Sequence, residues 1–315
     1  MPAKTEATRK AFGAALAEAG ARDERIVVLT ADLGGSTRAG VFGEEFPGRF
    51  FNVGVAEANM MGIAAGMAMS GLRPFATTFS VFATGKAWEQ VRQVIAYPSI
   101  PVRIVASHAG LTVGEDGASH QMLEDISNMR VLPHMSVIVP ADGPEATAAT
   151  HFLAGYDESP VYMRLARAAF PVVHEGEPTF SFGKLDNLAE GSDVVLFACG
   201  IMVSRALEAR ETLATEGISA AVVNVSTIKP LDVDGVLAWA QRCGCAVAAE
   251  EHQGMGGLSS ALAEVLSEHH PVPLARVAMQ DVFGQSGPAE ELLTHYGLTA
   301  HGVAEGARKV LKAKS

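Results

Sequence analysis

The segment that decides the fold class reads Phe50-Phe-Asn-Val-Gly-Val-Ala-Glu57-Ala-Asn-Met-Met61. It begins with the short run Phe50–Val53, a strand candidate. It continues to about Met69 as a run of small and apolar residues, which is typical of a buried helix. A strand that leads directly into a helix is the repeating unit of parallel α/β sheets with helices on both faces. We therefore predict an α/β protein.

The same alternation extends along residues 1–170, which we expect to form one doubly wound, parallel-sheet domain. A helix is predicted over Thr5–Gly20, and Trp88, Val91 and Ile95 recur at helical spacing in another. The remaining predicted strands of this domain are Ile26–Leu29, Phe75–Thr78, Val102–Ala106, Met135–Val139 and Val161–Leu165.

A second, smaller domain is predicted over residues 192–315, after an interdomain linker at residues 171–191. The linker contains Pro171, Pro178 and several charges, and it breaks the periodic pattern. The predicted strands beyond it are Val194–Ala198, Ala220–Val225, Ala246–Glu250 and Ala275–Met279. The predicted helices are Ser204–Glu216, Asp232–Cys243, Leu258–Ser267 and Val303–Lys312.

Composition narrows the class of protein. The 315 residues carry a formal net charge of -11, which argues against a general nucleic-acid binder because such proteins need a basic face. The longest apolar runs, such as Val194–Val203, are shorter than the ~20 residues that a membrane helix needs. The N-terminus lacks the apolar core of a signal peptide, and three cysteines cannot form a disulfide framework. We expect a soluble, cytoplasmic protein.

Glu57 is the first candidate functional residue. It is the only ionisable side chain between Val53 and Met69, so a carboxylate stands alone in a helix that should be buried. Such a carboxylate is costly unless it is paired or protonated, although the first turn of a helix favours an anion. The structural interpretation is a Glu that pairs with a Lys or Arg from another part of the chain. The functional interpretation is a catalytic or cofactor-binding carboxylate.

A second candidate is the loop Ser107–Gln121, which follows the strand that ends near Ala106. It contains His108, Asp116 and His120, groups that can donate and accept protons. A polar surface turn is the alternative. No known metal-ligand spacing occurs, so no metal ligand is predicted in this chain.

Phe79 and Phe82 form the third candidate, again beyond a predicted strand. Three residues apart, they would share one face of a helix. Core packing is the bland interpretation, and a platform for a flat heterocycle is the functional one. The sequence has no G-x-G-x-x-G, P-loop or G-x-S-x-G motif, which argues against the direct dinucleotide, P-loop and α/β-hydrolase interpretations.

Taken in order, these motifs resemble the C-terminal half of transketolases of the split-chain kind, over nearly the whole sequence. Gly54-Val-Ala-Glu57 resembles the catalytic-glutamate motif of that family, and Thr78-Phe79-Ser-Val-Phe82 its aromatic segment. Gly114-Glu-Asp-Gly-Ala-Ser-His-Gln121 is similar to G-E-D-G-P-T-H-Q. Glu250-Glu-His252 with Gly256-Gly-Leu258, and Asp281-Val-Phe-Gly-Gln-Ser-Gly287, resemble signatures of the C-terminal domain. The resemblance implies a thiamine-diphosphate pyrimidine-binding domain followed by a smaller, mixed-sheet transketolase C-terminal domain.

The resemblance also implies roles for the candidate residues. Glu57 would hold N1′ of the aminopyrimidine of thiamine diphosphate, Phe79 and Phe82 would line its pocket, and Asp32 would lie near cofactor and substrate. Asp116 and His120 would contact the sugar hydroxyls and the reacting oxygens. The implied sugar-phosphate ligands are Arg9, Ser36, His108 and Arg167.

Three departures from the family pattern stand out. Ala118 and Ser119 replace Pro and Thr, and Gly85 stands where a further aromatic residue is common. The G-D-G…N motif that holds Mg²⁺ and the diphosphate is missing, and Ala141-Asp142-Gly143, its nearest match, lies in the wrong domain. We therefore expect the chain to need a partner that carries G-D-G…N. The expected assembly is of the α2β2 type, with active sites at subunit interfaces.

The function that follows is transfer of a two-carbon ketol unit from a ketose phosphate to an aldose phosphate. Two alternatives keep the cofactor: the β subunit of a 2-oxo acid dehydrogenase, and an enzyme like deoxyxylulose-phosphate synthase. The four phosphate-binding positions favour transketolase over the 2-oxo acid dehydrogenases, whose substrates have no sugar phosphate. A non-catalytic partner subunit is a third alternative. The sequence does not identify the ketose or the aldose.

Overall fold

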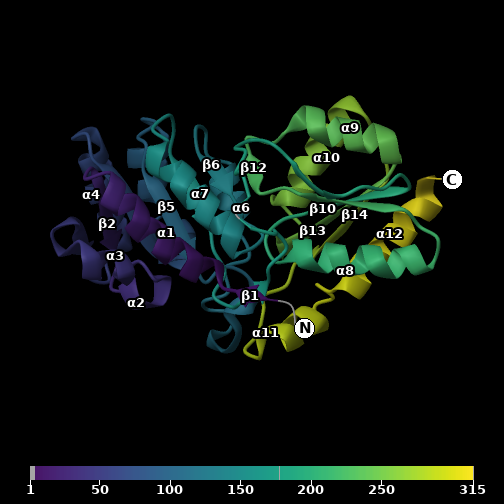
Figure 1. Cartoon of the computed structure of the whole chain (residues 1–315), viewed down its shortest axis with the longest axis horizontal. Helices are drawn as coiled ribbons and strands as arrows, with labels where there is room; N and C mark the ends of the chain where they lie inside the picture. Colours follow the sequence, from purple (N-terminus) through teal and green to yellow (C-terminus); the bar gives the residue numbers. More distant parts are fainter. Residues whose placement is uncertain (1–3, 177, 315) are drawn as a thin grey trace.

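The first part of the chain is organised around a mainly parallel sheet (Figure 1). The computed structural model describes residues 4–176 and 178–314, and within them this sheet has seven strands in the order β12-β6-β7-β5-β4-β2-β3. All neighbours are parallel except β12, which comes from the second half of the chain and pairs antiparallel with β6. The strands are β2 (Ile26–Thr30), β3 (Phe50–Asn52), β4 (Arg73–Phe79), β5 (Arg103–Ser107), β6 (Ser136–Ile138), β7 (Val161–Arg164) and β12 (Thr227–Lys229).

Helices cover both faces of this sheet, as predicted. On one face lie α1 (Thr8–Arg22), α3 (Gly40–Glu45) and α7 (Gly143–Gly155), which bury Phe12 and Phe42. On the other lie α4 (Glu57–Met69) and α6 (Asp125–Arg130), which bury Met60 and Met129. The short α2 (Gly34–Thr37) follows β2. Burial of these apolar side chains provides the main stabilisation, at about 25 cal/mol per Å² of area removed from water.

The second part of the chain forms a mixed sheet of five strands within the described residues, in the order β14-β13-β10-β11-β9. Its helices lie on both faces, α9 and α10 on one and α8 and α12 on the other (Figure 1). Only β9 runs antiparallel to its neighbour. The elements are β9 (Asp186–Ala189), β10 (Val194–Ala198), α8 (Met202–Thr215), β11 (Ala220–Asn224), α9 (Val233–Cys243), β13 (Ala246–Gln253), α10 (Leu258–His269), β14 (Leu274–Met279), α11 (Ala289–His295) and α12 (Ala300–Lys314).

The segment predicted as a linker, residues 171–191, contains ordered structure. It includes β9, and β8 (Phe170–Pro171) at its start pairs with β1 (Thr5–Glu6). His174 lies between two carboxylates, with Nδ1 3.0 Å from Asp142 Oδ2 and Nε2 2.9 Å from Asp186 Oδ2. Burial lowers the pKa of His174, but the two carboxylates outweigh burial and raise that pKa to about 10. The segment is therefore held to the first domain by a charged histidine.

Two predicted features differ in detail. The helix expected across Trp88, Val91 and Ile95 is interrupted: a short α5 (Trp88–Gln90) lies between the π-helical segments η2 (Phe82–Lys86) and η3 (Val91–Ala96). Ala141-Asp142-Gly143, the nearest match to G-D-G, is the start of α7, where the side chain of Asp142 caps the helix by accepting the N–H of Glu145 at 3.0 Å.

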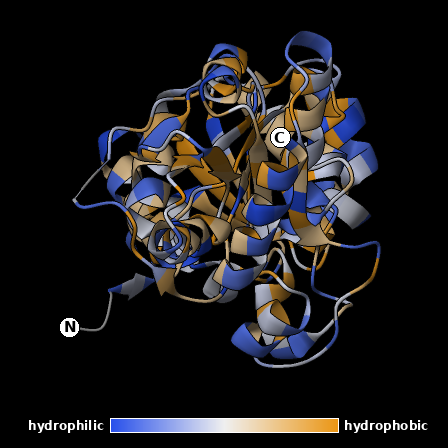
Figure 2. Ribbon diagram, turned by 90° about the vertical axis from the view of Figure 1, so that its right-hand side faces the viewer, coloured by the Kyte–Doolittle hydropathy of each residue, from blue (hydrophilic) through white to orange (hydrophobic). Residues whose placement is uncertain are grey.

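The ribbon shows its most hydrophobic residues toward the interior strands and its hydrophilic residues mainly on the outer helices (Figure 2). No helix in the described part of the chain has the length and apolar character needed to span a membrane.

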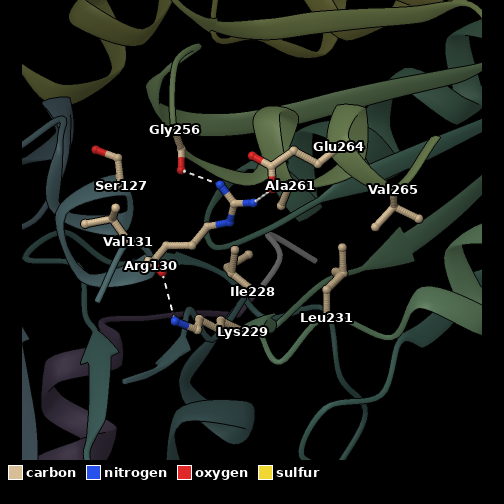
Figure 3. Close-up of a pocket in the computed structure, with 10 residues that line it drawn as sticks. All are labelled: Ser127, Arg130, Val131, Ile228, Lys229, Leu231, Gly256, Ala261, Glu264 and Val265. Atoms are coloured by element: carbon tan, nitrogen blue, oxygen red, sulfur yellow. Dashed lines mark hydrogen bonds and ion pairs between the residues drawn. The ribbon is translucent and has the colours of Figure 1, made fainter. Parts of the chain in front are cut away.

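A cavity of about 610 Å³ lies between the two domains (Figure 3). Arg130 of α6 donates to the carbonyl of Gly256 at 3.3 Å and pairs with Glu264 of α10. Lys229 donates to two carbonyls at the end of α6, those of Arg130 and Leu132. These cations therefore serve contacts between elements. The lining residues are Ser127, Arg130, Val131, Ile228, Lys229, Leu231, Gly256, Ala261, Glu264 and Val265.

Candidate functional site

The predicted site residues gather beyond the carboxyl ends of the strands in the first sheet. In parallel α/β sheets this edge is where ligands bind, because the loops that follow neighbouring strands meet there. Asp32 follows β2, Glu57 follows β3, and Phe79 ends β4. His108 follows β5, and Arg167 follows β7.

Glu57 is buried at the first position of α4, with 1% of its surface exposed. Its Oε2 accepts a hydrogen bond from Lys86 Nζ at 2.6 Å, and the Lys86 side chain is half exposed. The positive end of the α4 dipole also favours the carboxylate. The pairing with Lys that the sequence left open is therefore present. Lys86 itself was not predicted, since it lies 29 residues away on η2.

Four rings from β4, η2 and the loop after β5 form a second group. Phe79 and Phe82 stack with centroids 5.9 Å apart and an angle of 10° between their planes. His108 stacks on Phe79 at 3.7 Å, and His120 meets Phe79 and Phe82 edge-on at 6.3 and 5.8 Å. The core-packing interpretation fits Phe79, which is buried, but Phe82 is only half-buried. The two histidines of the loop Ser107–Gln121 therefore contact the Phe79 and Phe82 pair.

His108 occupies an unusual electrostatic position. It has a left-handed backbone, with φ of 58°, and its Nδ1 lies 2.9 Å from the hydroxyl of Ser107. Burial is the main cause that lowers its pKa to about 3, and the positive charges of Arg9 and Arg167 lower it further. His108 is therefore neutral near pH 7 and can offer a hydrogen bond rather than a charge.

The predicted phosphate-binding residues lie together. Arg9 Nη1 donates to the carbonyl of Ser36 at 2.6 Å, and its Nε donates to the carbonyl of Arg167 at 3.1 Å. Burial, then Arg38 and Arg167, lower the pKa of Arg9, so three guanidinium groups share this region. Arg38 was not predicted. A cluster of cations of this kind is suited to an anion with several oxygens.

Asp116 and Asp32 have different contacts from these groups. Asp116 is exposed at the end of η4 (Leu111–Asp116). Asp32 has a φ of 61°, and its carboxylate accepts from Asn52 Nδ2 at 3.0 Å. Asn52 in turn accepts the N–H groups of Asp32 and Gly54. Among the described residues, no hydrogen bond or ion pair joins Asp32 or Asp116 to Glu57 or to the four rings.

Asn52 is a second residue that the sequence analysis missed. Its amide ties the turn after β2 to the turn that precedes Glu57. The available signal was a polar residue at the carboxyl end of an edge strand, a position where ligand-binding residues gather.

This region has room and chemistry for a flat, nitrogen-containing ring. A Cβ added at Gly54 or Gly85 would meet no atom within 4 Å, and both glycines are exposed. The buried carboxylate can accept a ring N–H, and the aromatic faces can flank the ring. The pyrimidine half of thiamine diphosphate fits these residues.

One cluster of carboxylates and a histidine in the described part of the chain includes none of the predicted site residues. One described group could be considered for a metal ion, that of Glu145, His174 and Asp186. Its His174 is held between carboxylates and has its pKa raised to about 10, so both ring nitrogens carry protons near pH 7. A metal ion would have to displace one of these protons, because histidine binds a metal through an unprotonated nitrogen.

Comparison with known proteins assigns both halves of the chain. Residues 4–172 match the transketolase pyrimidine-binding domain, and residues 183–303 match the transketolase C-terminal domain. A transketolase C-terminal section from Methanocaldococcus jannaschii is 46% identical over 307 residues, covering 96% of each chain. A solved structure described as a split gene transketolase, an inactive β4 tetramer, is 48% identical with a TM-score of 0.92. The alignment covers 98% of this chain and 99% of that one.

Another relative is 1-deoxy-D-xylulose-5-phosphate synthase 1 of Geobacter sulfurreducens, which is 37% identical over 96% of this chain. This chain spans 48% of that protein, about half of its length. The fold, the two matched domains and the similarity over nearly the whole length agree. The chain belongs to the transketolase family and has the pyrimidine-binding and C-terminal domains that form a separate subunit in split transketolases.

Proposed function

We propose that this chain is one subunit of a thiamine-diphosphate-dependent transketolase. The enzyme would transfer a two-carbon ketol unit from a ketose phosphate to an aldose phosphate. The observation that supports this most directly is that η2 contacts both groups: its Lys86 pairs with buried Glu57, and its Phe82 stacks on Phe79. Arg167 follows β7 at the same sheet edge, and its carbonyl accepts a hydrogen bond from Arg9. A carboxylate for the cofactor and cations for a sugar phosphate would thus act in one site.

The proposed division of roles follows from the chemistry of each side chain. When bound, thiamine diphosphate would supply the nucleophilic carbon that accepts the two-carbon unit. Glu57 would orient the pyrimidine through N1′, and Phe79 and Phe82 would flank its ring. Asp116 and His120 would face the sugar hydroxyls, with His120 placed to move a proton. Asp32 would lie near cofactor and substrate.

The phosphate of the sugar would be held by a mixed set of donors, Arg9, Ser36, His108 and Arg167. The guanidinium groups would bind phosphate oxygens in a bidentate manner. His108 would remain neutral and donate a single hydrogen bond, since its pKa is lowered to about 3. The set is close enough to act together, because Arg9 already contacts the backbone of Ser36 and Arg167.

Lys86 sets a condition for cofactor binding. Its ammonium occupies Glu57 Oε2, one of the two oxygens that could meet a pyrimidine nitrogen. Half of the Lys86 side chain is exposed, so it can turn toward solvent without disturbing the core. We expect Lys86 to shift when the pyrimidine binds.

A partner chain would provide the Mg²⁺ and diphosphate site. Support comes from the absence of G-D-G…N in this sequence, and from a largely apolar face that α4 leaves exposed. That face, which we call the α4 face, consists of Asn59, Gly62, Gly66 and Met69 of α4, with Val55 just before the helix. Two copies of each chain would form an α2β2 assembly with the sites at their interfaces.

The test is to reconstitute the chain with a candidate partner that carries G-D-G…N, thiamine diphosphate and Mg²⁺. A ketose phosphate donor and an aldose phosphate acceptor are supplied, and the two sugar products are measured. We expect turnover that needs both chains and falls at least ~100-fold in Glu57→Gln. The exposed Glu89→Gln is the matched control. Full turnover by Glu57→Gln would support the non-catalytic alternative.

A second function is favoured by the similarity to 1-deoxy-D-xylulose-5-phosphate synthase. The same reconstituted enzyme would then accept pyruvate and glyceraldehyde 3-phosphate and release CO₂.

The variant Arg9→Met distinguishes an enzyme that binds a sugar phosphate from a 2-oxo acid dehydrogenase. It should raise KM for a phosphorylated substrate, and it should leave a 2-oxo acid without phosphate unaffected.

A further inference from the structure

A buried carboxylate of the second domain, Glu251, contacts the loop that carries His108 and His120. Glu251 lies near the end of β13, is 2% exposed, and its Oε1 accepts the backbone N–H of Thr112 at 2.6 Å. Thr112 belongs to the loop that begins at His108 and ends at Gln121. The two residues are 139 positions apart in the sequence.

The loop backbone is shaped to receive this carboxylate. Gly110 has a φ of +79°, a left-handed conformation that favours glycine. A Cβ added there would lie 2.3 Å from Glu251 Cδ, so a larger residue would displace the carboxylate. The contact between the loop and Glu251 therefore needs both a glycine at position 110 and the carboxylate of Glu251.

Glu251 is itself held in place from the first domain. Arg164 Nη2 donates to the carbonyl of Glu251 at 2.9 Å, and its Nη1 lies 3.8 Å from Oε2. Arg164 also bonds Asp125 through Nε at 2.8 Å. Burial raises the pKa of Glu251, and Arg164 and the N–H of Thr112 oppose that rise. A buried carboxylate with this much support keeps a fixed orientation.

The same domain contacts the loop at two further points. Gln121 Nε2 donates to the carbonyl of Gln285 at 2.9 Å as well as to two carbonyls within the loop. Ser286 donates its hydroxyl to the carbonyl of Glu115. Glu251 differs from Gln285 and Ser286 because it is 2% exposed, whereas those two residues are exposed.

We propose that Glu251 is a positioning residue for the loop of residues 108–121. By fixing the backbone at Thr112, it would set where His108, Asp116 and His120 lie relative to Glu57. The consequence for turnover rests on the proposed transketolase function, whereas the effect on the loop does not. The C-terminal domain would thus act on the reaction without contributing a group that touches the substrate.

Hydrogen–deuterium exchange on the full chain tests the loop directly. Glu251→Ala is expected to speed exchange in peptides that span residues 108–121 by about tenfold, while peptides from β10 and β11 stay unchanged. Glu250→Ala is the matched control, because the neighbouring Glu250 is equally buried but caps α10 through the N–H groups of Leu258 and Ser259. It should leave loop exchange unchanged.

The conservative variant separates a specific contact from general loosening. Glu251→Gln keeps an oxygen that can accept the Thr112 N–H, so we expect it to restore most of the protection. Unchanged loop exchange in Glu251→Ala would overturn the proposal. So would equal acceleration in the loop and in β10 and β11, because the carboxylate would then support the whole fold.

A reconstituted enzyme adds a readout of positioning. Glu251→Ala should lower kcat for the sugar substrates, while the affinity for thiamine diphosphate, measured by calorimetry, stays within about twofold. Equal loss of cofactor affinity would contradict a role confined to the loop. A wild-type enzyme that fails to turn over sugar phosphates would count against the proposed function alone, since the exchange experiment needs no turnover.

Discussion

The Glu57 carboxylate is stabilised by the half-exposed ammonium of Lys86 and by its position in the first turn of α4. Lys86→Met removes the ammonium and leaves the buried carboxylate without its ion-pair partner. We expect the free energy of unfolding of the lone chain to fall by about 1 kcal/mol, at the low end for charged hydrogen bonds because Lys86 is screened by solvent. Urea unfolding at pH 7 measures the change.

Arg22→Met is the control for this loss, because Arg22 pairs with Glu18 at 3.9 Å and both side chains are exposed. It should change stability by a few tenths of a kcal/mol at most. A Lys86→Met chain as stable as the wild type would contradict the assignment of Lys86 as the counterion of Glu57.

His108 gives a prediction for pH. Its folded pKa of about 3 lies below the unfolded value of about 6.5, so the folded state binds a proton less readily than the unfolded state. The stability that His108 contributes is present above pH 6.5 and is lost as the pH falls toward 3. An NMR titration should show no change of the His108 ring signal between pH 8 and 5.

Arg9→Met should raise the pKa of His108, because one of the charges that lowers it is gone. The ring signal is assigned from its absence in His108→Gln. A wild-type ring that titrates near pH 6.5 would contradict the buried, cation-flanked position.

The sequence singled out candidate site residues but not the residues that contact them. Glu57, Phe79 and His108 stand out because a charged or aromatic side chain follows a predicted strand. Lys86 and Asn52 do not, since their role depends on the approach of η2 to α4 and of β3 to β2. Glu251 lies in a recognised signature, but only tertiary structure brings it to Thr112.

At the scale of elements, the segment around His174 shows a charge effect on stability. The two carboxylates raise the pKa of His174 to about 10, above the unfolded value of about 6.5. Its contribution is therefore full below pH 6.5 and is lost as the pH rises through 10. His174→Gln should cost about 2 kcal/mol at pH 7 and much less at pH 10.

Urea unfolding of the wild-type protein and of His174→Gln at pH 7, 8, 9 and 10 tests whether their stabilities become more similar as the pH rises. Parallel curves, with the same difference in stability at every pH, would contradict a charged His174. The experiment also bears on residues 171–191, because it tests whether part of that segment stabilises the fold.

Local patterns predicted many strands and helices of the fold. They missed several helices, including α7, as well as strands that depend on distant pairing. The strands β9 and β12 are short, and each gains its place by pairing antiparallel with a strand from another part of the chain. The π-helical turns of η2 and η3 have no periodic signature that differs from that of an α-helix over a few residues. The start of α7 could have been predicted from the sequence, since Asp142-Gly-Pro is typical of a helix N-terminus.

For the whole molecule, the α4 face allows a test of association. A Cβ added at Gly62 meets no atom within 4 Å, so Gly62→Glu should fold, and it should gain about 0.5–1 kcal/mol from better helix propensity. The new charge would nevertheless face the proposed interface. We expect the variant to lose assembly with the partner in analytical ultracentrifugation while remaining folded.

Gly155→Glu is the matched control, because Gly155 is exposed at the end of α7 and its Cβ position is also open. It should assemble like the wild type. Normal assembly of Gly62→Glu would show that the α4 face lies outside the interface.

The central claim is that this chain holds only half of the cofactor site. The most direct measurement is calorimetric titration of thiamine diphosphate with Mg²⁺ into the chain alone, and into the chain mixed with a partner that carries G-D-G…N. We predict tight binding in the mixture and no comparable binding by either chain alone. Equally tight binding by this chain without a partner would contradict the claim.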